Sequence, residues 1–133
     1  MTTAIGVSSP LTVDSIDGAY KGLKTTKENI SQNLRVLILT NPGERIRVPN
    51  FGVGIKKFLF EQGNQQTRDS IRSRIAQQVA TYMPYIAIEN ISFTSIDSTT
   101  DKNADNTVGI SIAYSYALDY KRIVDLLSLT ITI

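Results

Sequence analysis

The fold of this chain is decided by residues 33–62, which read NLRVLILTNPGERIRVPNFGVGIKKFLFEQ. The pattern predicts, in order, the end of an amphipathic helix, a turn, a short basic strand, a glycine-broken loop and a short aromatic helix. Pro42 and Gly43 suit the centre of a type II turn, because proline presets φ and glycine accepts a positive φ. No side chain in this stretch is placed as a catalytic group would need to be.

A short extended segment is predicted directly after this turn, from Glu44 to Val48. Alternation along a strand would put Ile46 and Val48 on one side and Arg45 and Arg47 on the other. We therefore expect a strand whose apolar side belongs to the fold and whose arginine side is free to contact a partner.

Two longer helices flank this stretch. Thr25 and Glu28 have the spacing of a capping box, and the helix that they begin is expected to reach about Leu39. A second helix is predicted from about residue 65 to residue 82, and Pro84 ends it because proline lacks the amide that a helix needs. Each helix has an apolar stripe at helical spacing, formed by Ile30, Leu34, Leu37 and Ile38 in the first and by Ile71, Ile75 and Val79 in the second.

The last third of the chain changes from helical spacing to the alternation of strands. Its apolar residues shift parity near Glu89–Asn90, which indicates a turn or a bulge. Residues 97–107 have the composition of a hairpin loop, Lys121–Arg122 fall in a short connection, and residues 127–133 alternate to the end. We expect an α+β fold, with helices in the N-terminal half packed on a small antiparallel β-sheet formed by the C-terminal half.

Size and composition limit the classes of function. At 133 residues the chain is expected to form a single domain, residues 1–133, with residues 1–16 as a loosely ordered lead-in. It contains no cysteine and no histidine, which excludes disulfides, thiolate or imidazole metal ligands and any Ser-His triad. We expect no cofactor and no metal. No apolar run approaches the ~20 residues of a membrane span, so no membrane contact is expected.

Positive charge is concentrated in residues 21–57, which hold eight basic and two acidic residues, a local +6 in a chain of net charge +2. Such a segment could meet nucleic acid, anionic lipid or an acidic protein surface, or it could be a solvated rim. Phe51, Phe58 and Phe60 are spaced as core residues rather than as exposed stacking platforms, and no nucleic-acid-binding motif is present. We expect no nucleic-acid partner.

One enzymatic interpretation is a cell-wall glycosidase that acts through Glu44 and Glu61. Glycoside hydrolysis needs two carboxyl groups across a sugar cleft, one of them with a raised pKa. Arg45 adjoins Glu44, and a nearby cation favours the ionised carboxylate, which is the wrong direction for a general acid. The chain also has no tryptophan to stack on a sugar. We expect no enzyme activity.

Three motifs follow one another in the deciding stretch: L-T-N-P-G-E-R at Leu39–Arg45, P-N-F-G at Pro49–Gly52 and F-L-F-E at Phe58–Glu61. In this order and at this spacing they closely resemble the GPW-type baseplate wedge family of contractile phage tails, some members of which carry an old lysozyme-like label. The resemblance covers roughly residues 17–133. Family members share an α+β fold, and relatives serve tailocin-like particles and type VI secretion baseplates.

The resemblance implies a structural baseplate wedge protein that sits in the tail baseplate of a virion and is made in the host cytoplasm. It further implies six copies around the tail tube, where the protein links the inner baseplate to the first sheath ring and nucleates sheath assembly. The implied partners are the large wedge subunits and the tail sheath protein. Phage, tailocin and type VI secretion origins all stay open.

Two candidate surfaces for the wedge subunits follow. One is the basic segment at Glu44, Arg45 and Arg47. The other is the position after the long helix where many family members carry a Glu-Pro-Arg docking site. Here it reads Met83-Pro84-Tyr85, which keeps only the proline, so we expect apolar and aromatic contact in place of charge. Packing in the core is the alternative for Met83 and Tyr85.

The C-terminal strand is the candidate surface for the sheath. Its alternating residues Leu127, Leu129, Ile131 and Ile133 run to the end of the sequence without the charge, proline or bulge that usually protects an edge. An open edge can accept a strand from a partner through backbone hydrogen bonds. The alternative is that this strand lies at the centre of its own sheet.

Overall fold

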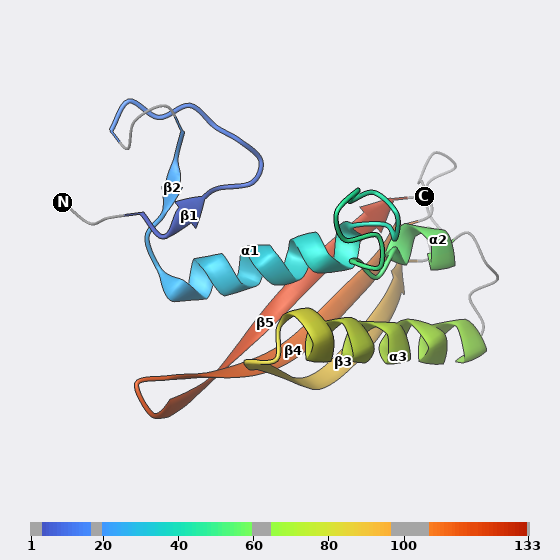
Figure 1. The fold of residues 1–133 in the computed structure, drawn as a ribbon. Coiled ribbons are helices and arrows are strands. Elements are labelled where there is room, and N and C mark those ends of the chain that lie inside the picture. Colours follow the sequence, from blue (N-terminus) through green and yellow to red (C-terminus); the bar gives the residue numbers. More distant parts are fainter. Residues whose placement is uncertain (1–3, 17–19, 60–64, 97–106, 133) are drawn as a thin grey trace. The chain divides into compact units, whose positions relative to one another are not determined.

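The computed structural model describes residues 4–16, 20–59, 65–96 and 107–132 of the chain (Figure 1). The chain forms two compact units, Met1–Val36 and Leu37–Ile133. Helices precede a β-sheet along the sequence, and the predicted α+β class is confirmed.

The first unit contains a small antiparallel pair of strands, β1 (Gly6–Val7) and β2 (Gly22–Leu23). Gln32, in the helix that follows, fastens the end of β1. Its Nε2 donates to the Val7 carbonyl oxygen at 2.9 Å, and its Oε1 accepts the Ser9 amide at 2.7 Å. One side chain thus holds a segment that lies more than 20 residues earlier in the sequence.

Helix α1 (Thr26–Leu39) begins at the predicted capping box, which is confirmed. The Thr25 hydroxyl accepts the Glu28 amide at 3.2 Å, and the Glu28 carboxylate accepts the Thr25 amide at 3.3 Å. Hydrogen bonding of the Glu28 carboxylate to the side chain and the backbone amide of Thr25 lowers the pKa of Glu28, because it favours the ionised form. The predicted stripe is confirmed as well, since all four of its members, Ile30, Leu34, Leu37 and Ile38, are buried.

The second unit is built on a three-stranded antiparallel sheet in the order β3 (Ile86–Ile96), β4 (Thr107–Leu118) and β5 (Lys121–Thr132). The irregularity expected near Glu89 is a β-bulge, because the register between β3 and β4 shifts between Ile88 and Asn90. The extra residue lets the apolar residues before and after it serve the same face of the sheet.

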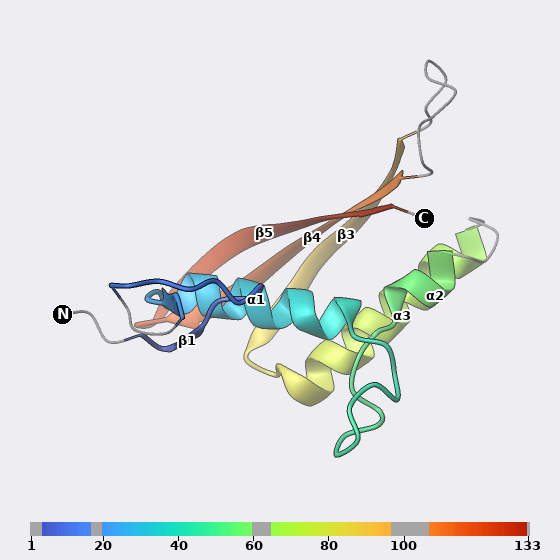
Figure 2. The same ribbon diagram turned by 90° about the horizontal axis from the view of Figure 1, so that it is seen from above.

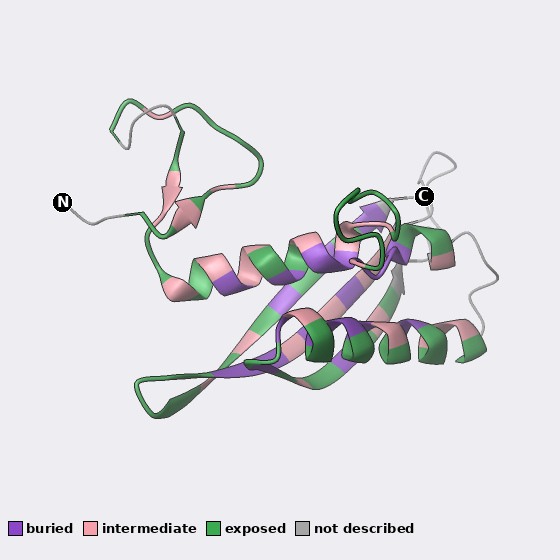
Figure 3. Cartoon of the chain, in the orientation of Figure 1, coloured by how far each residue is buried: buried purple, intermediate pink, exposed green. Residues whose placement is uncertain are grey.

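Two further helices, α2 (Ile55–Leu59) and α3 (Gln65–Tyr82), precede the sheet in sequence, and α3 lies along it beside β3 (Figures 1 and 2). The predicted stripe of α3 is buried. Strands β4 and β5 show alternating buried positions (Figure 3). The buried residues of these two strands with large apolar or aromatic side chains are Ile110, Ile112, Tyr114, Tyr116, Leu127, Leu129 and Ile131.

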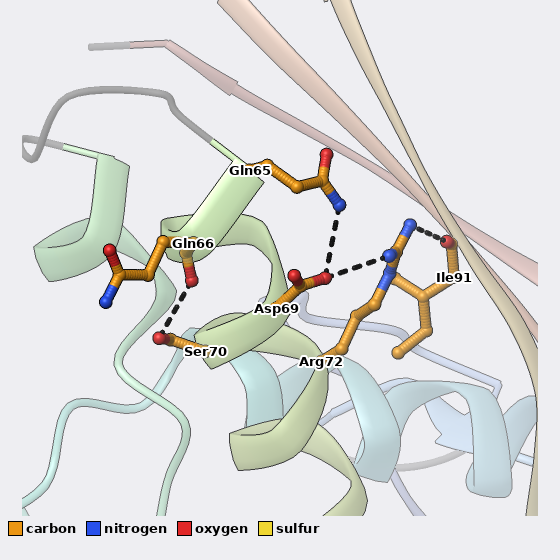
Figure 4. A network of polar contacts seen from close by, with 6 residues as sticks. All are labelled: Gln65, Gln66, Asp69, Ser70, Arg72 and Ile91. Carbon is orange, nitrogen blue, oxygen red and sulfur yellow. Dashed lines mark hydrogen bonds and ion pairs between the residues drawn. The ribbon is translucent and has the colours of Figure 1, made fainter.

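Arg72 fastens α3 to β3 (Figure 4). Its Nη2 donates to the Ile91 carbonyl oxygen at 3.4 Å, and its Nη1 contacts Asp69 Oδ1 at 3.2 Å. The Gln65 Nε2 donates to the same carboxylate oxygen at 3.2 Å, and the Arg72 guanidinium also lies 5.5 Å from the centre of the Phe93 ring. Arg72 therefore bridges the polar surface of the helix and the edge of the sheet.

Two local predictions are wrong. The segment Glu44–Val48 forms bends rather than a strand, and Ile46 is 97% exposed instead of facing the core. Lys121–Arg122 already belong to β5, because Asp119 and Tyr120 both adopt positive φ and close the β4–β5 hairpin in a tight turn. The hairpin loop predicted at residues 97–107 lies outside the described residues except for Thr107, which begins β4.

Candidate docking surfaces

The segment predicted as a basic strand is a projecting loop, residues 43–50, which we call the basic loop. It closes on itself at its base, because the Gly43 amide donates to the Pro49 carbonyl oxygen at 2.7 Å. The Glu44 amide donates to the Asn41 carbonyl oxygen at 3.2 Å, and the Phe51 amide donates to the Val48 carbonyl oxygen at 3.1 Å. All eight residues of the loop are exposed.

Buried Gln78 of α3 holds the end of the basic loop. Its Nε2 donates to the Asn50 carbonyl oxygen at 3.0 Å, and its Oε1 accepts the Gly52 amide at 2.9 Å. The Arg74 guanidinium adds a bond of 3.4 Å to the Gly52 carbonyl oxygen. Buried polar groups need such partners, so the carboxamide of Gln78 and the loop backbone satisfy each other.

The P-N-F-G motif, Pro49–Gly52, begins at the end of the basic loop, and the structure explains its glycine, Gly52. Its φ is +112°, and a Cβ added there would lie 2.2 Å from the Thr40 carbonyl oxygen. Glycine is therefore needed both for the dihedral angle and for the close approach. The Val53 amide then donates to the Leu37 carbonyl oxygen at 3.0 Å, and the Gly54 amide to that of Thr40 at 2.9 Å, which joins the segment after the loop to the end of α1.

The charged residues of the basic loop have different surroundings. The Arg45 guanidinium lies 4.0 Å from the centre of the Phe51 ring, which in turn meets Tyr82 edge-on at 4.9 Å. Arg47 has no ion pair with any described residue. Glu44 accepts a hydrogen bond of 2.7 Å from Asn41 Nδ2. Arg45 is thus partly a support for its own loop, whereas no described residue holds Arg47 in a comparable way.

The glycosidase interpretation pairs Glu44 with Glu61, and Glu61 lies outside the described residues. Glu44 itself stands on the exposed loop and not in a hollow. Among the described residues no cluster of three or more carboxylates could hold a metal ion. Within the same ranges no helix has both the length and the apolar character to cross a membrane.

The Met83-Pro84-Tyr85 segment is divided between core and surface. Met83 is buried and its amide donates to the Val79 carbonyl oxygen at 2.8 Å, which completes the last turn of α3. Pro84 is exposed and Tyr85 is 54% exposed. Core packing thus accounts for Met83, and only Pro84 and Tyr85 are available to a partner.

Pro84 and Tyr85 line an open hollow of about 490 Å³ on the sheet. Its other walls are Ile86 and Ala87 of β3, Ser115, Tyr116 and Ala117 of β4, and Arg122 of β5. Arg122 makes an ion pair with Glu89, and the Ser115 hydroxyl donates to the same carboxylate at 2.7 Å. These contacts, led by that from Ser115, lower the pKa of Glu89. The lining of the hollow is therefore mostly apolar, and its charged residue, Arg122, is paired with Glu89.

The C-terminal strand β5 is an edge strand. It pairs with β4 on one side, and no described strand pairs with its other side. Leu127, Leu129 and Ile131 are buried in the chain itself, while Ile133 lies outside the described residues. These side chains therefore belong to the core of this chain, whereas the backbone edge is left for a partner.

The contacts of Asp125 show which backbone amides of β5 lie on that open edge. Its Oδ2 accepts a hydrogen bond of 3.1 Å from the Tyr114 hydroxyl, and its Oδ1 accepts the Leu126 amide at 2.9 Å. The Leu126 amide thus bonds to a neighbouring side chain rather than to β4. Because amides alternate between the two edges of a strand, those of Ser128 and Thr130 also point away from β4. Asp125 covers the start of the edge, and the part after it stays open.

An α+β unit with a three-stranded antiparallel sheet, an open edge strand and a projecting loop has the features of a protein that binds other proteins. The family model for "Baseplate wedge protein gp25" matches residues 24–120. The chain therefore belongs to this family and is a baseplate wedge-type structural protein. The match begins just before α1 and ends in the turn before β5.

Solved structures share the fold. A Geobacter sulfurreducens protein named as a candidate tail lysozyme is 20% identical, with a TM-score of 0.64 over 85% of this chain and 97% of that one. A chain of the anti-feeding prophage baseplate is 21% identical, with a TM-score of 0.61 over 91% and 82%. A chain of the pyocin R2 baseplate is 13% identical, with a TM-score of 0.51 over 92% and 98%. Comparison with curated proteins gave no match.

Proposed function

We propose that this chain is a wedge subunit in the baseplate of a contractile injection tail, where it links the inner baseplate to the first sheath ring and nucleates sheath assembly. The observation that carries the proposal is the open edge of β5, whose amides at Ser128 and Thr130 point away from β4. A strand of the tail sheath protein that paired there would extend the sheet by one strand.

The other candidate surfaces are proposed to face the large wedge subunits. The basic loop offers Glu44, Arg45 and Arg47, and the hollow beside β3 offers Pro84 and Tyr85. We place the chain in the tail baseplate of a virion or a related particle, made in the host cytoplasm and acting as one unit from residue 1 to residue 133. Six copies around the tail tube fit the six-fold symmetry applied to the anti-feeding prophage baseplate.

Removal of the chain tests this function. Particles assembled without it are expected to contain tubes and baseplates but no extended sheath, because no edge is available to start sheath pairing. Supplying the intact chain should restore the sheath. Complete particles that carry full-length sheaths but lack the chain would contradict the proposal.

The alternative, a cell-wall glycosidase acting through Glu44 and Glu61, is favoured by one observation, the likeness to a structure named for a tail lysozyme. Against it, Glu44 lies on an exposed loop and accepts a hydrogen bond from Asn41. We propose that the chain is not an enzyme. In a peptidoglycan turbidity assay the purified chain should match a no-protein control, and an activity that Glu44→Gln abolished would overturn this view.

A further inference from the structure

Ile46 lies midway along the basic loop, at the position that we call its tip, and is 97% exposed between Arg45 and Arg47 in the sequence. Single exposed apolar residues are common on protein surfaces and need no explanation by themselves. Ile46 differs because the loop that carries it is fixed. The loop is closed by the bond from Gly43 to Pro49 and clamped by buried Gln78.

A fixed loop favours binding because less conformational freedom is lost when a partner arrives. The support extends to the arginine before the tip, since Arg45 rests on the ring of Phe51. It extends also to Glu44, whose carboxylate is held by Asn41. Ile46 and Arg47 are thus presented together on a supported loop, with the Ile46 side chain open to solvent.

Charge identifies the kind of surface that would receive this tip. The basic loop carries Arg45 and Arg47 against Glu44, so two cations flank Ile46 in the sequence. Opposite potentials across an interface guide association and fix its register. An apolar side chain beside a cation is complementary to an apolar socket with carboxylates at its rim.

We propose that Ile46 is the anchor of the basic loop and inserts into an apolar socket, rimmed by carboxylates, on a neighbouring baseplate protein. The inference rests on the proposed function, because it needs a baseplate neighbour. It adds to that function the residue that is buried and the chemistry of the surface that buries it. Arg47 pairs with the rim, and Gln78 is a positioning residue that acts through the loop backbone.

The chain contains no cysteine, so Ile46→Cys introduces a single thiol. Its maleimide labelling rate is measured in the free chain and in assembled particles, and Ala80→Cys on the exposed face of α3 serves as the matched control. We expect the labelling rate of the thiol at position 46 to fall by at least about tenfold on assembly, as burial of an anchor implies. The same thiol, labelled with an environment-sensitive dye before assembly, should shift its emission to the blue, because the socket is apolar.

Substitutions of Ile46 and Arg47 in the same particles test the apolar anchor and the neighbouring charge separately. Ile46→Asp is expected to lower incorporation of the chain at least about tenfold, whereas Ile46→Val should keep it near normal, because a smaller aliphatic group still fits. Arg47→Glu should lower incorporation and Arg47→Lys should retain most of it. The free Ile46→Asp variant should keep the thermal unfolding temperature of the parent, since the Ile46 side chain is exposed and not part of the core.

The outcomes distinguish the inference from the proposed function. Absence of the parent chain from purified particles would contradict the function itself. Presence of the chain, together with equal labelling of the Ile46→Cys thiol in the free and assembled states, would overturn the inference alone. Protection of that thiol without a blue shift, or normal incorporation of Ile46→Asp, would likewise exclude an apolar socket.

Discussion

The Gln78 side chain donates a hydrogen bond from Nε2 to the carbonyl oxygen of Asn50 at 3.0 Å, across 28 residues of sequence. The same carboxamide accepts the Gly52 amide at 2.9 Å, and Gln78 is only 4% exposed. A buried side chain of α3 therefore sets the conformation of a loop that contains no regular secondary structure. The shape of the basic loop depends on α3, which comes later in the sequence.

Replacement of Gln78 by leucine should destabilise the fold. Leucine has a similar volume but leaves the Asn50 carbonyl and the Gly52 amide without their partner, at a cost of about 1–3 kcal/mol for each group that stays buried. Thermal unfolding monitored by circular dichroism measures the loss. Gln77→Leu, on the exposed side of the same helix, is the control and should change stability by no more than about 0.5 kcal/mol. Equal effects of the two changes would show that Gln78 does not hold the loop.

The substitutions Arg45→Glu and Arg47→Glu should differ in their effects on stability but should have the same effect on assembly. Arg45→Glu removes the contact with Phe51 and should cost about 0.5–1 kcal/mol, the range for an exposed cation–π pair. Arg47→Glu should leave unfolding unchanged, because no described residue forms an ion pair with Arg47. Both variants should fail to enter baseplates, as measured by their amounts in purified particles. Normal entry of Arg47→Glu would remove Arg47 from the docking surface.

The sequence was sufficient to predict those features whose causes are local. The capping box at Thr25 and Glu28, the stripes of α1 and α3 and the bulge at Glu89 all follow from spacing within one element. The strand predicted at Glu44–Val48 failed because its alternation covers only five residues. The loop around it is held by the bond from Gly43 to Pro49 and by the bonds of Gln78 to Asn50 and Gly52, and none of these contacts is visible as a sequence pattern.

The candidate surfaces likewise include features with local causes, which the sequence predicts, and features that depend on distant parts of the chain. The open edge of β5 could be inferred from an alternating run that lacks protecting features, but the burial of Leu127, Leu129 and Ile131 depends on the rest of the fold. The turn at Asp119 and Tyr120 was missed because neither residue is a glycine, the usual marker of positive φ. The exposure of Ile46 was missed because isoleucine in an alternating segment is normally taken as a core residue.

The capping box should contribute to stability in a pH-dependent way. The pKa of Glu28 is lowered from its ordinary value of 4.5 by the hydrogen bonds from Thr25. A carboxyl group with a lowered folded-state pKa stabilises the fold above the unfolded-state pKa, and this contribution disappears as the pH falls through the folded-state value. The stability difference between the parent and Glu28→Gln should therefore be constant near neutral pH and shrink below pH 4.5. A difference that grew on acidification would contradict this assignment.

A proline substitution at Ser128 can test the open edge of β5 without disturbing the core, and one at Leu129 provides the contrast. Ser128→Pro removes an amide that points away from β4, whereas Leu129→Pro removes one that pairs with β4. We expect Ser128→Pro to unfold close to the parent temperature but to give baseplates without extended sheath. Leu129→Pro should lower the unfolding temperature strongly.

Ser128→Ala keeps the amide at the same position and is the matched control, so its particles should carry normal sheaths. If sheaths also polymerise normally on baseplates that contain Ser128→Pro, pairing at this edge is not the route to the sheath.

The most direct measurement is a reconstruction of the particle in which this chain is located. We expect six copies around the tail tube, between the inner baseplate and the first sheath ring. A strand of a sheath subunit should lie against β5 from residue 127 to residue 132, and the basic loop should face a wedge subunit. A particle in which β5 faces solvent, or in which the chain lies away from the sheath, would contradict the proposed role.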